Sequence, residues 1–162
     1  DELGRPRGLV GDEIHVFARI VCVANHFDRL RYPASGTVQP RIRVLKTMVC
    51  SELATRFDPI ILGALPLVVP AFPPGTLVTL NTGERAVVLQ WHPEAPCQPL
   101  VQVLTQGSLA VRHMNQPNDH SGNQYDLRER CELSIIEHEG IDVSRDSFRL
   151  VSPSEKSQKN AA

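Results

Sequence analysis

The stretch "FPPGTLVTLNTGERAVVLQWHPEAPCQPLVQVL" (residues 72–104) predicts a β-meander. Three short segments rich in Val, Leu and Thr, at 76–80, 85–91 and 99–104, are separated by turn residues. The first two segments are joined by "NTGE", in which Gly83 supplies the positive φ angle that a tight hairpin needs. Three strands within about 30 residues are typical of a small barrel-like antiparallel sheet.

The chain after this meander is mostly polar. The stretch "HMNQPNDHSGNQYD" (113–126) has almost no apolar residues and predicts a long loop. "CELSIIEHEGIDV" (131–143) is expected to return to the sheet as a last hairpin. Residues 152–162 are expected to form a disordered tail.

The chain before the meander predicts three helices. Apolar residues recur at helical spacing from Asp12 to about Leu30, and a second helix is expected from about Pro40 as its first residue. Asp58 is a good N-cap for a third, short helix, which is expected to end at Pro66. Helices followed by strands predict an α+β fold. The predicted boundaries are 1–70 for the helical part, 71–151 for a small β subdomain, and 152–162 for the tail.

Composition excludes several classes of partner. The 162 residues carry a formal net charge of −1, without the basic excess that a nucleic acid polymer or an anionic membrane surface attracts. The longest mostly apolar run, 60–72, contains two prolines and is too short to span a bilayer. The polar first residues predict no signal peptide, and the start without Met predicts a piece of a larger protein.

The four cysteines are widely spaced and include no C-x-x-C pair, which favours a reducing, cytoplasmic compartment. The histidines at 92, 113, 120 and 138 lie in or beside turns and polar loops, and their spacing fits no zinc template. They are predicted to lie on the surface.

The stretch "ARIVCVANHFDRL" (18–30) carries the polar residues of greatest interest. On a helical wheel Asp28 projects into the middle of an apolar arc, and Asn25 flanks it. His26 points the opposite way, and we expect it on a solvated face with His15. The arc predicted to face the core consists of Phe17, Ile20, Val21, Ala24 and Phe27, and it is widened by Val16, Val23 and Leu30.

A carboxylate on an apolar face must be compensated, because desolvating it alone costs several kcal/mol. Asp28 could cap the following loop or pair with Arg31 or Arg56. A metal ion or a cationic feature of a ligand site would compensate it equally well. The residues themselves leave these alternatives open.

The order of these motifs resembles the C-terminal half of HD-GYP domains, metal-dependent phosphohydrolases best known as cyclic di-GMP phosphodiesterases. The resemblance covers residues 1 to about 104. It begins with "DELGRPRGLVGDEI" (1–14), which is similar to the glycine-rich loop of that family. It implies that the helices belong to an HD-type bundle that holds iron or manganese. The histidine ligands of that family would precede this chain.

The resemblance also implies roles for individual residues. In "VANHFDRL" (23–30), Asn25 stands where the family has a metal-ligand aspartate, and Asp28 matches an aspartate close to the nucleotide. Arg31 corresponds to a basic residue that meets substrate phosphates. The signature Gly-Tyr-Pro becomes Gly4, Arg5 and Pro6.

An asparagine amide opposes the repulsion between two metal dications less than a carboxylate does. The resemblance therefore implies a degenerate phosphodiesterase that binds a cyclic dinucleotide or a signalling protein. One alternative is an active phosphodiesterase whose other ligands lie outside this chain. Another is a protein-interaction module that uses the β subdomain. A homodimer is a further alternative.

Overall fold

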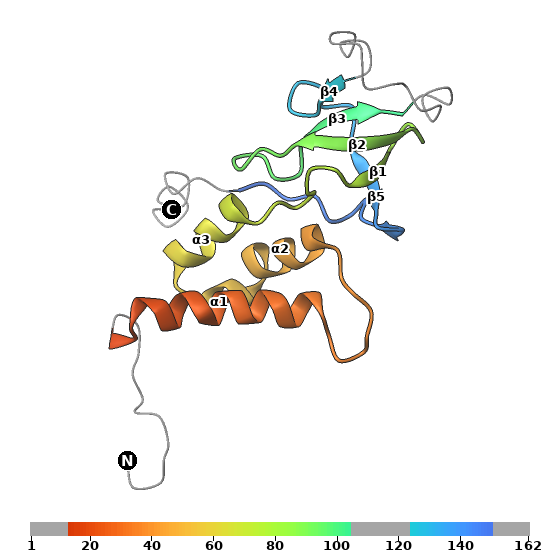
Figure 1. The fold of residues 1–162 in the computed structure, drawn as a ribbon. Helices are drawn as coiled ribbons and strands as arrows, with labels where there is room; N and C mark the ends of the chain where they lie inside the picture. Colours follow the sequence, from red (N-terminus) through yellow and green to blue (C-terminus); the bar gives the residue numbers. More distant parts are fainter. Residues whose placement is uncertain (1–12, 105–123, 151–162) are drawn as a thin grey trace, which may run out of the picture.

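The protein, described by a computed structural model over residues 13–104 and 124–150, has an α+β fold, as predicted. In the described residues, three α-helices precede a six-stranded antiparallel sheet. Figure 1 shows the helices gathered on one side of the molecule and the sheet on the other. The predicted tail lies outside the described residues.

The three predicted helices are present. They are α1 (Val16–Arg31), α2 (Arg41–Cys50) and α3 (Pro59–Val68), and a short 3-10 helix, η2 (Glu52–Arg56), joins α2 to α3. The predicted cap of α3 is confirmed, because the Asp58 carboxylate accepts hydrogen bonds from the N–H groups of Ile60 and Ile61 at 2.8 and 3.1 Å. This cap satisfies two of the free donors at the start of the helix.

Two predicted positions of prolines are wrong. Helix α3 does not end at Pro66 but continues to Val68, where the N–H of Val69 bonds to the carbonyl of Leu65. The Pro66 ring is buried, and we attribute its tolerance within the helix to this burial, which offsets the missing hydrogen bond. Pro40 is the N-cap of α2 rather than its first helical residue.

The sheet contains the predicted meander, and its hydrogen-bonded order is β4-β3-β2-β1-β5-β6. All pairs of neighbouring strands are antiparallel. The strands are β1 (Leu77–Leu80), β2 (Arg85–Gln90), β3 (Leu100–Val103), β4 (Gln124–Asp126), β5 (Ile135–His138) and β6 (Ile141–Asp142).

Both predicted hairpins are confirmed. Gly83 has a φ of 84° in the β1–β2 turn, as the "NTGE" sequence indicates. Strands β5 and β6 form the last hairpin. The end of the predicted polar loop is wrong, because residues 124–126 form strand β4 against β3. The rest of that loop lies outside the described residues.

The helices and the sheet share one hydrophobic core. Alternate residues of the central strands face it, among them Val78 and Leu80 of β1 and Val88 of β2. Helix α2 supplies Leu45 and Met48 from the other side. The sheet therefore holds the helices in position, and α1 is the helix on which the candidate site residues lie.

Candidate functional site

Helix α1 packs against the core with only one edge of the predicted arc. Val23 is 3% exposed, and Phe27 and Leu30 pack against the core beside it. In contrast, the side chains of Phe17 and Val21 are 69% and 63% exposed. The prediction that the Phe17, Val21 and Ala24 side faces the core is wrong, because α2 and α3 contact the Val23 side of the helix.

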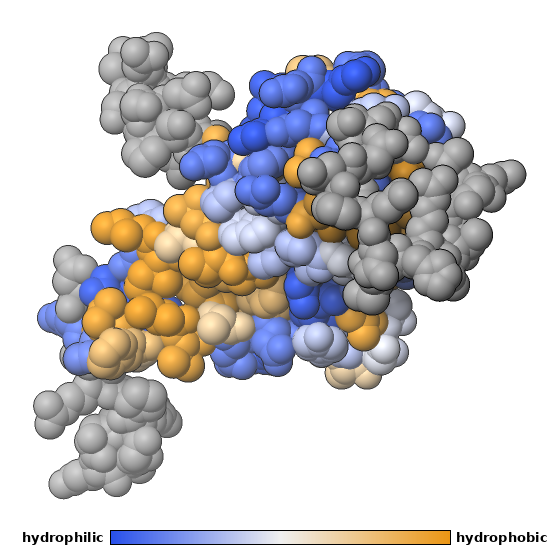
Figure 2. Space-filling view, turned by 45° about the horizontal axis from the view of Figure 1, so that its top comes forward, coloured by the Kyte–Doolittle hydropathy of each residue, from blue (hydrophilic) through white to orange (hydrophobic). Residues whose placement is uncertain are grey.

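The exposed side of α1 is an apolar surface. Its large apolar members are Val16, Phe17, Ile20 and Val21, and α3 adds an exposed set of its own, Ile60, Leu67 and Val68. Figure 2 shows apolar side chains gathered over the helical part of the molecule. We call the four residues of α1, together with Ala24, the α1 face. A helix that is apolar on two sides needs a second partner to bury the second side.

Asn25 and Asp28 lie on this exposed side of α1. They are three residues apart and both are exposed, so the expectation that they point into the core of this chain is wrong. The described residues provide no hydrogen-bond or ionic partner for the Asp28 carboxylate. The pairings with Arg31 or Arg56 that the sequence allowed do not occur.

The Arg31 guanidinium is held elsewhere. Arg31 is 6% exposed, and its Nη1 and Nη2 donate to the Glu139 carboxylate at 3.3–3.4 Å. Nη1 also donates to the carbonyl of Gln39. Arg31 therefore joins the end of α1 to the turn between β5 and β6, and the structure does not bring it together with Asp28 as a phosphate contact.

The described residues do not by themselves form a metal centre. Among them no group of three or more His, Cys, Asp or Glu side chains could hold a metal ion. Asn25 and Asp28 offer one amide and one carboxylate, which is fewer than iron or manganese requires. Gly4, Arg5 and Pro6, the expected signature loop, lie outside the described residues. No described helix is long and apolar enough to cross a membrane.

His26 and two other histidines differ from their predictions. His26 is half-buried, and its ring lies edge-on to Phe57 at 5.1 Å between centroids, so it belongs to the packed side of α1. His92 is buried, and its Nε2 lies 3.6 Å from Asp126 Oδ2. A side-chain hydrogen bond from Arg128 is the main cause that lowers the pKa of Asp126.

His138 is the most buried histidine of the described residues, at 1% exposure. Its ring meets the Phe72 ring edge-on at 5.2 Å. Simple alternation along β5 would place Ile135 and His138 on opposite faces. A register shift between Thr79 and Leu80 lets both face inward, and no signal in the sequence marks that shift.

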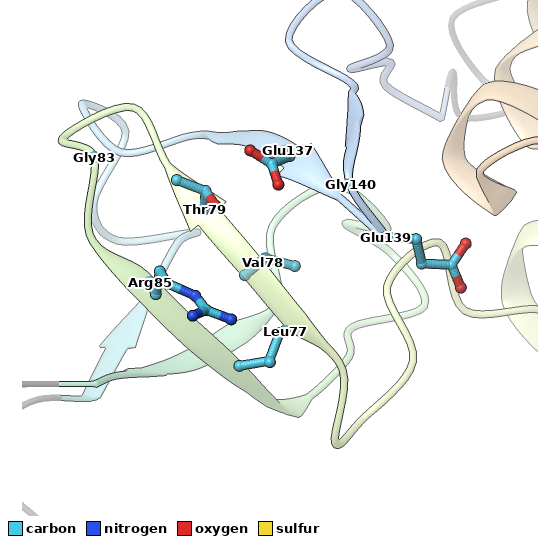
Figure 3. A pocket seen from close by; sticks show the side chains of 8 residues that line it. All are labelled: Leu77, Val78, Thr79, Gly83, Arg85, Glu137, Glu139 and Gly140. Atoms are coloured by element: carbon cyan, nitrogen blue, oxygen red, sulfur yellow. The ribbon is translucent and has the colours of Figure 1, made fainter. Parts of the chain in front are cut away.

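An open groove of about 540 Å³ lies over the outer face of the sheet. Thr79 of β1 pairs in register with Arg85 of β2 on one side and with Glu137 of β5 on the other. Figure 3 shows Arg85, Thr79 and Glu137 along this face, with the Glu139 carboxylate pointing away from them. Within the described part of the chain, neither Arg85 nor Glu137 has an ion-pair partner.

The sheet region matches a family model described as a KOW domain associated with HD domain, over residues 77–137. This match links the chain to HD-domain proteins. It begins with β1 and ends within β5, so it covers strands β1 to β4, most of β5 and none of the helices. It agrees with the expected HD association and does not extend to HD-GYP domains specifically. No curated protein matches the chain, and no solved structure does.

Proposed function

We propose that this chain is the C-terminal part of an HD-GYP-type module that resembles cyclic di-GMP phosphodiesterases. In this copy the metal site is degenerate, and the module binds a cyclic dinucleotide or a signalling partner. The observation that carries the proposal is the position of Asn25 and Asp28 on the exposed side of α1, beside the α1 face, in a chain whose sheet matches an HD-associated domain.

The α1 face is where the helical body of an HD-type domain packs in this proposal. Burial of Phe17 and Val21 would stabilise that contact by roughly 1.5–3 kcal/mol for each side chain. Asn25 and Asp28 would then lie at the boundary between α1 and that body. Covered in this way, the Asp28 carboxylate needs a cation or hydrogen-bond donors from the covering body or from a ligand.

The proposal of a degenerate site rests on Asn25. A phosphodiesterase with clustered metal ions needs anionic ligands to hold the ions together and to generate a hydroxide. An amide contributes a neutral oxygen, so iron or manganese would be held weakly or lost. In a pocket without metal, an amide has a lower desolvation cost than a carboxylate.

The test uses the natural protein that carries this chain, as wild type and as Asn25→Asp. Iron and manganese are measured by elemental analysis, and binding and hydrolysis of cyclic di-GMP are measured in parallel. We expect the wild type to bind the dinucleotide with little metal and no product. We expect Asn25→Asp to increase the metal content, and Arg29→Gln, an exposed change on the same helix, serves as control.

Two results would contradict this proposal. Stoichiometric metal with turnover by the wild type would favour the alternative of an active phosphodiesterase with ligands outside this chain. No binding and no effect of Asn25→Asp would show that α1 carries no such site.

A homodimer that uses the α1 face would appear as a dimer that Val21→Glu dissociates.

A second candidate function is a protein-interaction module that uses the groove over the sheet. It is favoured by the charges of Arg85 and Glu137, which flank Thr79 without ionic partners among the described residues. Such separated charges fit a peptide that carries an acidic and a basic side chain. Charge reversal of both, Arg85→Glu with Glu137→Arg, should abolish capture of that partner and leave dinucleotide binding unchanged.

A further inference from the structure

A single ionic contact joins the end of α1 to the β5–β6 turn. Arg31 is the last residue of α1, and its guanidinium bonds to both oxygens of the Glu139 carboxylate. The two residues are 108 positions apart in the chain. Because Arg31 is buried, loss of Glu139 would leave a guanidinium without its counter-charge, which is strongly unfavourable.

The turn that presents Glu139 has an unusual backbone. Glu139 has a φ of 54° and Gly140 a φ of 74°, so both central residues of this two-residue hairpin loop are left-handed. Such positions favour Gly, Asn or Asp, and a glutamate there is disfavoured. We infer that the contact with Arg31 compensates for this unfavourable conformation, so loss of the contact would also weaken the turn.

His138 lies directly before Glu139 in the chain and is buried. Its ring is buried against Phe72, and neither ring nitrogen has a hydrogen-bond partner among the described residues. The charged groups around it are Glu139 of its own turn, Arg31 of α1 and Arg41 of α2. Phe72, from the connection between α3 and β1, contributes no charge.

The neutral form of His138 is therefore favoured in the folded protein. Burial is the main cause that lowers the pKa of His138, and Arg31 and Arg41 lower it further, while Glu139 acts in the opposite direction. An imidazolium at this position would have two N–H donors, and within the described part of the chain Glu139 supplies the only nearby carboxylate. Its N–H groups would compete with the Arg31 guanidinium for this carboxylate.

We propose that protonation of His138 breaks the contact between Arg31 and Glu139, so that acidification separates the β5–β6 turn from the end of α1. In one form of this opening, the Glu139 carboxylate leaves Arg31 and accepts from the imidazolium. In the other, the imidazolium moves into solvent and the β5–β6 turn moves away from α1. Asp28 lies one helical turn before Arg31, so the position of the candidate site depends on this junction. That last consequence rests on the proposed function, whereas the opening of the junction does not.

The direction of the pH dependence follows from linkage. Above a pH of about 6.5 both the folded and the unfolded chain hold His138 neutral. Its contribution to the free energy of unfolding is therefore constant there. Below that pH the unfolded chain takes up a proton that the folded chain resists. The unfolding equilibrium constant then rises by up to about tenfold for each pH unit, until the folded form also becomes protonated.

The experiment is a double-mutant cycle with Arg31→Met and Glu139→Gln, measured by urea unfolding at pH 7.5 and at the lower pH at which NMR titration shows His138 of the folded chain to be protonated. Trp91 fluorescence reports on the sheet, and circular dichroism on the helices. We expect a coupling free energy between the two residues at pH 7.5 that is lost at the lower pH. In a His138→Phe background, which keeps the ring contact with Phe72, the coupling should persist at both values.

His138→Leu replaces His138→Phe if the phenylalanine does not fit. His26→Gln is the matched control, because His26 is half-buried on α1 but distant in sequence from this turn, and it should leave the pH effect intact. An equal coupling free energy at both pH values in the wild type would overturn the proposal. It would also be overturned if this coupling were lost to the same extent with and without the His138 side chain. Neither readout involves a nucleotide or a metal, so failure of the proposed function would not affect this test.

Discussion

The Arg43 guanidinium on α2 lies 2.9 Å, from Nε to Oδ2, from the carboxylate of Asp146, which follows the last strand. Arg43 Nη2 also donates to the carbonyl of Asp142 at 2.7 Å. Together with the contact between Arg31 and Glu139, these bonds tie the end of the described chain to the helices that begin it. The orientation of the helices relative to the sheet therefore depends on polar contacts as well as on the shared core.

We predict that Arg43→Met lowers the free energy of unfolding by about 2 kcal/mol, because it leaves the mostly buried Asp146 carboxylate without its partner. Urea unfolding at neutral pH measures the change. Addition of Asp146→Asn should recover part of the loss, since it removes the unpaired charge. Arg29→Met, an exposed change on α1, should stay within about 0.5 kcal/mol of wild type.

The two sides of α1 should respond differently to truncation. Val23→Ala is expected to lower the stability of this chain by about 2 kcal/mol, because Val23 is buried in the core. Phe17→Ala should change it by less than about 0.5 kcal/mol, because the ring is mostly exposed. Thermal unfolding of both variants measures this difference. An equal loss in the two would mean that the α1 face is already buried in the free chain.

The four free thiols should react at different rates with a thiol reagent. Burial raises the pKa of the Cys97 thiol to about 11, and its Sγ also accepts a hydrogen bond from the N–H of Phe148. We expect Cys97 to react at neutral pH only after unfolding, because the thiolate is the reactive form. Cys22 and Cys131 are exposed and should react first, and mass spectrometry of the labelled peptides identifies each site.

Asp58 should make the contact between α1 and α3 sensitive to strong acid. The hydrogen bond from the N–H of Ile61 is the main cause that lowers the pKa of Asp58, and the Arg19 guanidinium, with Nη1 at 2.5 Å from Oδ2, contributes to the shift. Its stabilising effect is complete above the unfolded pKa of about 3.9 and is lost as the pH falls through the lower folded value.

Asp58→Asn keeps an acceptor for the cap but removes the charge. We expect this variant to have a lower free energy of unfolding than wild type at pH 6. At pH 2.5 the two values should be close, as measured by urea unfolding. Glu52→Gln, an exposed change in the neighbouring turn, is the control. A difference between Asp58→Asn and wild type that is the same at both pH values would contradict the role of the charge.

Most of the secondary structure could be predicted because it depends on local chemistry. Asp58 caps α3 through its own neighbours, and Gly83 adopts a backbone conformation that few other residues tolerate. Pro66 is the instructive exception. A proline locally favours the end of a helix. The core against which Pro66 packs is formed by residues distant in the sequence, so the local sequence does not reveal it.

The candidate site was predicted only in part. The helical wheel correctly groups Asn25, Asp28 and Val21 on one side of α1, since that grouping depends only on the helix period. It could not show that this side is exposed. Arg31 shows the same limit, because its partner Glu139 lies 108 residues away.

The sequence alone determined the order of helices and strands, the β-meander and the hairpin at Gly83, since caps, turns and periodicity act over a few residues. Only the tertiary structure decided which side of α1 is buried and that His138 faces inward. Helix α1 is apolar around much of its circumference. Its packing against α2 and α3 therefore determines that Val23, and not Val21, is buried. His138 turns inward because the register between β1 and β5 shifts, and that shift is set by the pairing of strands distant in the sequence.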